Sequence, residues 1–340
     1  MTVLREPRGS TSRRSNPGRA RRRQILVRRC SLLLLVMIFG FFFAFIAVGL
    51  FRGSPSSQTN GVYQGSNQSE LPDDPPKVPV YEAFGEEVTP AGKSLSAKIA
   101  QTALTYSRGE SVRLVATRVG RFGSRVSPSV LRPAFVPGSR SWAKTIYPQM
   151  AGYTGDTMGA MVVVRQTTED EQGRRTNQTR VVDVRLRLDQ LGSVGGSPVE
   201  RPVDLSPEAK AVLNDPAIDL PDSSRWDIYR GEVSDNLLAA LSSAAGSFRF
   251  RVAVFKTGHP PSVWGTSNPS AHSEGAAADI WSVAGKPVLL QRESGSAAFD
   301  LASAWVSGGA IQVGSPWTFT SDGFSTFTDE VHQDHIHVQP

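Results

Sequence analysis

An uncharged apolar run near the N-terminus constrains this chain more than any other feature of its sequence. Residues 31–51, SLLLLVMIFGFFFAFIAVGLF, contain no charged side chain. As a helix this run would be about 31 Å long, enough to cross a bilayer core of about 30 Å. The alternative is a cleaved signal peptide, but its apolar region is shorter and GLFRGSP is a poor cleavage site. The sequence therefore predicts an uncleaved transmembrane signal-anchor over residues 31–51.

The charge distribution predicts how this anchor is oriented. Of the 37 Lys and Arg residues, ten lie in residues 1–30, against one of the 31 acidic residues, so this tail carries +9. The remaining 27 basic and 30 acidic residues carry −3. Positive charge before a membrane helix favours a cytoplasmic tail, which places everything after the anchor outside the cell membrane. The mildly acidic remainder argues against a nucleic-acid partner.

The external part divides by composition into three segments. Residues 52–79 are rich in Ser, Gln, Asn, Gly and Pro, which predicts a disordered stalk. Residues 80–195 predict an α+β module of unknown role. Within it, SLSAKIAQTALTYSRG has helical spacing with Ser94 or Ser96 as a cap, and SVRLVATRV resembles a strand. GAMVVVRQTTED and QTRVVDVRLRLDQ predict a long hairpin, whereas AGKS at residues 91–94 lacks the first glycine of a phosphate loop.

Residues 196–340 predict a second α+β unit with an antiparallel sheet. SDNLLAALSSAAGSF reads as a helix capped by Ser234, and SGSAAFDLASAWVSGG as a helix ended by glycine. RFRVAVFKTG, AIQVG and the C-terminal HIHV are strand candidates. The only cysteine, Cys30, precedes the anchor, so the external part has neither disulfides nor thiolate metal sites.

All five histidines of the chain lie in this last unit. Clustering of histidines in a cysteine-free unit favours a metal site built from imidazole and carboxylate ligands. In HIH on a strand, the two imidazoles point to the same face of the sheet. The histidines are His259, His272, His332, His335 and His337.

The stretch SAHSEGAAAD carries a more specific pattern. It fits S-x-H-x-x-G-x-A-x-D at all five fixed positions, which are Ser270, His272, Gly275, Ala277 and Asp279. Together with the C-terminal H-x-H, it resembles the zinc peptidases of the D-Ala-D-Ala carboxypeptidase family. That family belongs to a group shared with lysostaphin-type endopeptidases and the hedgehog signalling domain. The resemblance covers roughly residues 227–340 and implies a hedgehog/D-Ala-D-Ala peptidase-like domain.

The resemblance also implies the roles of particular residues. His272, Asp279 and His337 correspond to the ligands of a catalytic Zn²⁺, and His335 to a histidine that hydrogen-bonds around the reaction centre. The family's general base lies three residues before the last ligand, which is Asp334 here.

Strict strand alternation would point Asp334 away from the face used by His337. The base role therefore requires a bend, or a strand that starts at Asp334. Glu330 is a reserve candidate for the base.

One departure from the family pattern concerns substrate recognition. The family usually reads S-G-Y-R after its first strand, and the arginine holds a substrate carboxylate. Here Thr257, Gly258 and His259 are followed by Pro260, so proline replaces the arginine. Lys256 or His259 could substitute, although neither offers the bidentate fork of arginine. We otherwise expect His259 and His332 to be structural or to support the ligands.

These observations predict a membrane-anchored, extracytoplasmic zinc metallopeptidase that cleaves peptidoglycan stem peptides. A D,D-carboxypeptidase and an endopeptidase both remain open, with cell-wall peptides as partners. The alternative is an envelope scaffold or binding protein that keeps the zinc site and has lost turnover. Pro260 favours the scaffold, whereas the matched ligands and Asp334 favour the enzyme.

Overall fold

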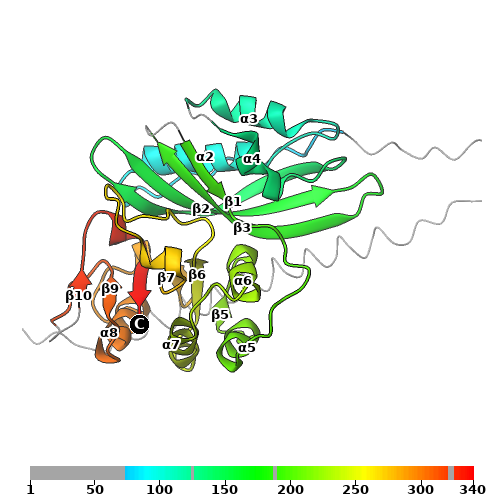
Figure 1. Ribbon diagram of the computed structural model, residues 1–340. Helices are drawn as coiled ribbons and strands as arrows, with labels where there is room; N and C mark the ends of the chain where they lie inside the picture. Colours follow the sequence, from blue (N-terminus) through cyan, green and yellow to red (C-terminus); the bar gives the residue numbers. More distant parts are fainter. Residues whose placement is uncertain (1–72, 124–125, 187–189, 321–324) are drawn as a thin grey trace, which may run out of the picture. The chain divides into compact units, whose positions relative to one another are not determined.

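The computed structural model describes residues 73–123, 126–186, 190–320 and 325–340, which all belong to one compact unit, Ser69–Pro340. The predicted anchor at residues 31–51 lies outside the described residues. Across the described ranges, no helix is both long and apolar enough to traverse a bilayer. As predicted, the fold is α+β, and it contains two sheets, A and B (Figure 1).

Sheet A is a four-stranded antiparallel meander. Its strands, in spatial order, are β1 (Arg140–Tyr153), β2 (Met158–Glu169), β3 (Arg175–Leu186) and β4 (Gln190–Val194). Strands β2 and β3 are the predicted hairpin, and their valines are buried because both faces of the sheet are covered. One face carries α2 (Pro90–Ala103), α3 (Val112–Gly120), α4 (Pro128–Leu131) and the 3₁₀ helix η1 (Arg132–Ala134) (Figure 1).

Two local predictions in this region are wrong. The strand expected over SVRLVATRV is the helix α3, whose N-cap Ser111 accepts a hydrogen bond from the Leu114 N–H at 3.3 Å. Its buried residues Val115 and Val119 lie four positions apart, on the same face of a helix. Burial of this face outweighs the preference of β-branched residues for strands. Helix α2 begins at Pro90, so Ser94 and Ser96 lie inside it rather than at its cap.

Sheet B is mixed rather than purely antiparallel. The central pairings β9–β11, β11–β7 and β7–β6 are antiparallel, as predicted, whereas the outer pairs β10–β9 and β5–β6 are parallel. The strands are β5 (Ile218–Asp219), β6 (Phe250–Val254), β7 (Ala278–Val283), β8 (Lys286–Pro287), β9 (Gln312–Gly314), β10 (Ser325–Phe327) and β11 (Ile336–Gln339).

Helices α5, α7 and α8 share the core of sheet B. The Ser234 cap of α7 is confirmed, since its Oγ accepts from the Leu237 N–H at 3.3 Å, and α8 ends before Gly308 as predicted. The helices of this half are α5 (Pro207–Asn214), α6 (Asp222–Tyr229), α7 (Asp235–Ala245), η2 (Ala271–Glu274), η3 (Val288–Leu290), α8 (Ala297–Ser307) and η4 (Val331–Gln333).

A small apolar cluster joins the two sheets. Tyr147 and Val163 of sheet A pack with Val254 and Trp281 of sheet B. The rings of Tyr147 and Trp281 stack with centroids 4.9 Å apart and planes inclined by 15°. This packing brings β1 of sheet A close to β7 of sheet B, the strand that carries Asp279.

Candidate metal centre

The local fold of SAHSEGAAAD explains why its fixed positions take these residue types. Ser270 caps η2, because its Oγ accepts from the His272 N–H at 3.3 Å. Gly275 ends this turn with φ +67°, and a Cβ there would lie 1.9 Å from the Glu232 carbonyl oxygen. Only glycine fits this position without displacing the backbone. The cap and the glycine together present the buried His272 side chain to the sheet.

Strand pairing brings the other two predicted ligands to the same place. His337 of β11 lies directly opposite Asp279 of β7 in the antiparallel register. The Asp279 Oδ1 lies 3.0 Å from His337 Nδ1 and 3.2 Å from His272 Nε2. His272 Nε2 and His337 Nδ1 are 3.1 Å apart. Three side chains from distant parts of the chain thus direct one ligand atom each to a common point.

The chemistry of these atoms suits a cation. His272 Nδ1 lies 2.6 Å from the Phe255 carbonyl oxygen, which only accepts, so Nδ1 carries the hydrogen and Nε2 presents its lone pair. A lone pair and a carboxylate oxygen repel each other unless a proton or a cation lies between them. Tetrahedral zinc, with ligands at about 2.0–2.1 Å, separates them by about 3.3 Å. Burial lowers the pKa of His337 to about 4, so this imidazole is neutral at pH 7, as a metal ligand must be.

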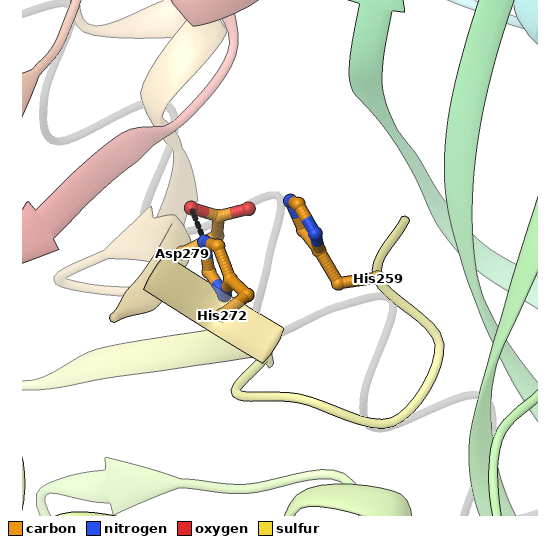
Figure 2. Close-up of side chains that lie close together, drawn as sticks. All are labelled: His259, His272 and Asp279. Atoms are coloured by element: carbon orange, nitrogen blue, oxygen red, sulfur yellow. Dashed lines mark ion pairs between the residues drawn. The ribbon is translucent and has the colours of Figure 1, made fainter. Parts of the chain in front are cut away.

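His259 joins this group, although the sequence led us to expect a supporting role. Ligand-type atoms of His259, His272 and Asp279 all lie within 4.8 Å of one another, so this cluster could hold a metal ion. Figure 2 shows His259 beside His272, while the dashed ion pair links His272 to Asp279. The two imidazoles stack at 3.9 Å with planes inclined by 14°. His259 Nδ1 lies 2.6 Å from the Pro260 carbonyl oxygen, so its other nitrogen is free to bind.

His335 and Asp334 form a hydrogen-bonded pair next to this point. His335 Nδ1 donates to Asp334 Oδ1 at 2.7 Å, and His335 Nε2 lies 3.9 Å from Asp279 Oδ1. Burial works to lower the pKa of His335, but the carboxylates of Asp279 and Asp334 outweigh it and raise the pKa. His335 therefore has a nitrogen directed toward the ligand atoms and a carboxylate partner behind it.

Asp334 lies between η4 and β11, outside the alternation of the strand. Its Oδ2 accepts from the Met150 N–H at 2.9 Å and also from Lys93 Nζ. Burial alone would raise the pKa of Asp334, but Lys93 and His335 hold it below its usual value. Both carboxylate oxygens are thus occupied by donors.

Three further residues were candidates from the sequence: Glu330, Lys256 and His332. Glu330 is exposed, and Lys256 Nζ lies 3.8 Å from a carboxylate oxygen of Glu232. His332 is paired with Asp329 at 2.7 Å, and its ring centroid is 4.9 Å from that of His335.

A cavity of about 470 Å³ opens over the ligand atoms. Met150, Tyr153 and Met161 of sheet A line it together with the five histidines and Phe327. The twenty described residues of the lining include no lysine or arginine. Trp264 also lines the cavity and lies directly against sheet A, because Gly152 and Gly159 leave no side chain in its place.

Two residues near the site were missed by sequence reasoning. Gln149 of β1 donates from Nε2 to Asp279 Oδ2 at 2.8 Å, and the fully buried Lys93 of α2 pairs with Asp334. Lys93 belongs to AGKS, where we considered only phosphate binding, and Gln149 is one glutamine within a strand. Neither has a local pattern that signals its role, because each acts across the contact between the two sheets.

Comparison with protein-family models, with curated proteins and with solved structures finds no match to this chain. The resemblance based on the two short motifs therefore stays a prediction.

Proposed function

We propose that this chain is a zinc-dependent peptidase, anchored in the cell membrane, that cleaves peptide stems of peptidoglycan outside the cell. The observation that carries the proposal is the convergence of His272 Nε2, Asp279 Oδ1 and His337 Nδ1 within 3.2 Å of one another. Two imidazoles and one carboxylate are a ligand set of catalytic zinc sites, which also keep an open position. The cavity above these atoms gives a substrate access.

The side chains of the site would have three roles in hydrolysis: metal binding, proton transfer and orientation of the proton-transfer group. Zinc held by His272, Asp279 and His337 would supply Lewis-acid activation of the scissile amide. His335 Nε2, which lies 3.9 Å from Asp279 Oδ1, would take up the proton that the attacking water releases and return it to the amine that leaves when the C–N bond breaks. Asp334 holds the Nδ1–H of His335 and so sets its tautomer and orientation. The hydrogen bonds on both oxygens of Asp334 favour His335 over Asp334 as the proton-transfer group.

The lining of the cavity favours an internal amide as substrate. Proline at position 260 removes the family arginine, and the described lining offers a free carboxylate neither lysine nor arginine. We therefore favour an endopeptidase over a carboxypeptidase. The peptidoglycan substrate and the external location rest on the motif resemblance and on the predicted anchor at residues 31–51.

A zinc-binding envelope scaffold without turnover is the second candidate. If Asp334 is the base, as the motif resemblance implies, its contact with Lys93 favours the scaffold, because a carboxylate stabilised in this way is a weak proton acceptor. In the scaffold the ligands would keep their metal, and the cavity would bind a wall peptide without cutting it.

Cleavage assays separate the two candidates. The full-length chain, loaded with zinc, is incubated with purified peptidoglycan, with cross-linked stem peptides and with stems ending in free D-Ala-D-Ala. The peptidase account expects cleavage that a chelator abolishes and zinc restores, fastest on cross-linked peptides. The His337→Ala variant is the control for contaminating hydrolases. If the zinc-loaded chain cleaves none of these three substrates, the result favours the scaffold instead.

A further inference from the structure

We infer that sheet A and helix α2 are part of the metal centre, with Gln149 and Lys93 as positioning residues for Asp279 and Asp334. The motif resemblance covers only residues 227–340, so neither residue belongs to it. This inference rests on the proposed metal binding for Gln149, whereas the Lys93 contact can be tested without metal.

Gln149 controls the orientation of the Asp279 carboxylate. Its side chain is fully buried within β1, and Nε2 donates to Asp279 Oδ2 at 2.8 Å. The other oxygen, Oδ1, is the one that faces His272 and His337. Holding Oδ2 from behind fixes the rotation of the carboxylate and directs Oδ1 toward the point of convergence. Partners of this kind orient metal ligands and raise metal affinity.

The backbone of β1 provides the next contact. β1 is the outer strand of sheet A, and within the described residues its free edge carries only the isolated bridge of Ser141 with Tyr106. The Met150 N–H donates to Asp334 Oδ2 at 2.9 Å instead of to another strand. The register of β1 with β2 is irregular between Met150 and Gly152, and such bulges redirect backbone and side chains next to functional sites. Neighbouring residues of one strand thus reach both carboxylates.

Lys93 reaches the same carboxylate from helix α2. Its side chain is fully buried and forms ion pairs with Glu87 and Asp334. Lysine is almost never fully buried unless it is paired, and here two carboxylates share one ammonium. Glu87, which precedes α2, already neutralises the charge of Lys93. The ion pair with Asp334 is therefore an additional contact, and it joins α2 to the residue that precedes β11. Because Asp334 also binds His335, Lys93 acts on His335 through this carboxylate.

Zinc affinity tests the role of Gln149. The Gln149→Leu variant keeps the side-chain size and removes the donor, and we expect it to bind zinc about 10–100-fold more weakly in a chelator competition. Thr145→Val is the matched control, because Thr145 is buried on the same strand and bonds the Ala97 carbonyl rather than the site. Zinc affinity of Gln149→Leu equal to that of the parent chain would overturn the inference for Gln149. A parent chain that binds no zinc would overturn it as well, together with the proposed function.

A spectroscopic signature tests the role of Lys93. Lys93→Met alone leaves the buried Glu87 carboxylate without its ion-pair partner and risks unfolding, so the variant is Lys93→Met combined with Glu87→Gln, which preserves net charge. In the metal-free chain we expect the Nδ1–H proton resonance of His335 to shift or to broaden beyond detection by NMR. The resonance is assigned by its loss in His335→Gln. An unchanged His335 resonance in a folded double variant would overturn the inference for Lys93, whatever the outcome of the cleavage assays.

Discussion

His272 Nε2 and His337 Nδ1 lie 3.1 Å apart although 65 residues separate them in the sequence. One imidazole comes from the turn η2 and the other from the last strand, β11. Asp279 Oδ1 lies within 3.2 Å of both nitrogens. Two buried imidazole nitrogens and a carboxylate oxygen at these separations form a set of atoms that suits one cation, and the proposed zinc site rests on this geometry.

The first prediction concerns the glycine of the motif. Gly275→Ala introduces a Cβ 1.9 Å from the Glu232 carbonyl oxygen at a residue with φ +67°. We expect it to lower the free energy of unfolding by at least about 2 kcal/mol and to weaken metal binding, since η2 must shift. Gly285→Ala is the matched control, because Gly285 has φ +79° but nothing within 4 Å. Equal effects of the two variants in denaturant unfolding would contradict the steric explanation.

The second prediction concerns the pH dependence of the metal-free chain. Burial lowers the pKa of His337 from 6.5 to about 4, so the unfolded chain takes up this proton before the folded chain does. Stability is therefore lost as the pH falls from about 6.5 to about 4, by about 3 kcal/mol from this residue. Burial also lowers the pKa of His259 and of His332, which adds losses of the same sign, whereas the raised pKa of His335 opposes them.

Denaturant unfolding in chelator at several pH values checks this linkage. The His337→Asn variant should show a smaller loss of stability between pH 6.5 and pH 4 than the parent chain. Parallel pH profiles for the two proteins would show that His337 titrates normally in the folded state.

The third prediction concerns the contact between Trp264 and sheet A. A Cβ on Gly152 would lie 2.0 Å from the indole ring, and Gly159, its partner in the register, would bring one to 2.6 Å. Gly152→Ala should therefore displace Trp264 and destabilise the chain by about 1–3 kcal/mol. In a Trp264→Ala background the same substitution should be nearly neutral. A double-mutant cycle measures this coupling, and purely additive effects would contradict direct packing.

The fourth prediction separates the two candidates for proton transfer. If His335 transfers the proton and Asp334 orients it, His335→Gln and Asp334→Asn should each lower kcat by about 10²–10⁴-fold, with little change in zinc affinity. Steady-state cleavage kinetics and chelator competition measure the two quantities. If Asp334 acts alone as the base, His335→Gln will retain most of the activity.

The sequence predicted the parts of this protein that depend on neighbouring residues. The hairpin β2–β3, the Ser234 cap and the end of α8 at Gly308 follow from local patterning and from the preferences of single residues. The motif resemblance implied that His337 and Asp279 bind the same metal, but the strand pairing that places them opposite each other was not predicted.

What the sequence could not predict arises between the two sheets. Gln149 and Lys93 reach the site only because the cluster around Tyr147 and Trp281 packs sheet A against sheet B. The strand expected at α3 failed for a different reason, since valine and threonine favour strands while the Ser111 cap and helical burial favour a helix. The contacts of Gln149 and Lys93 with the site depend on tertiary packing, and no local sequence pattern predicts them.

Metal analysis of the purified full-length chain tests the central claim most directly. After zinc loading and dialysis we expect one zinc per chain, with X-ray absorption showing two imidazole nitrogens and a carboxylate oxygen at about 2.0–2.2 Å. His272→Ala and His337→Ala should each lose this zinc. A parent chain that holds no stoichiometric zinc, or variants that retain it unchanged, would contradict the account.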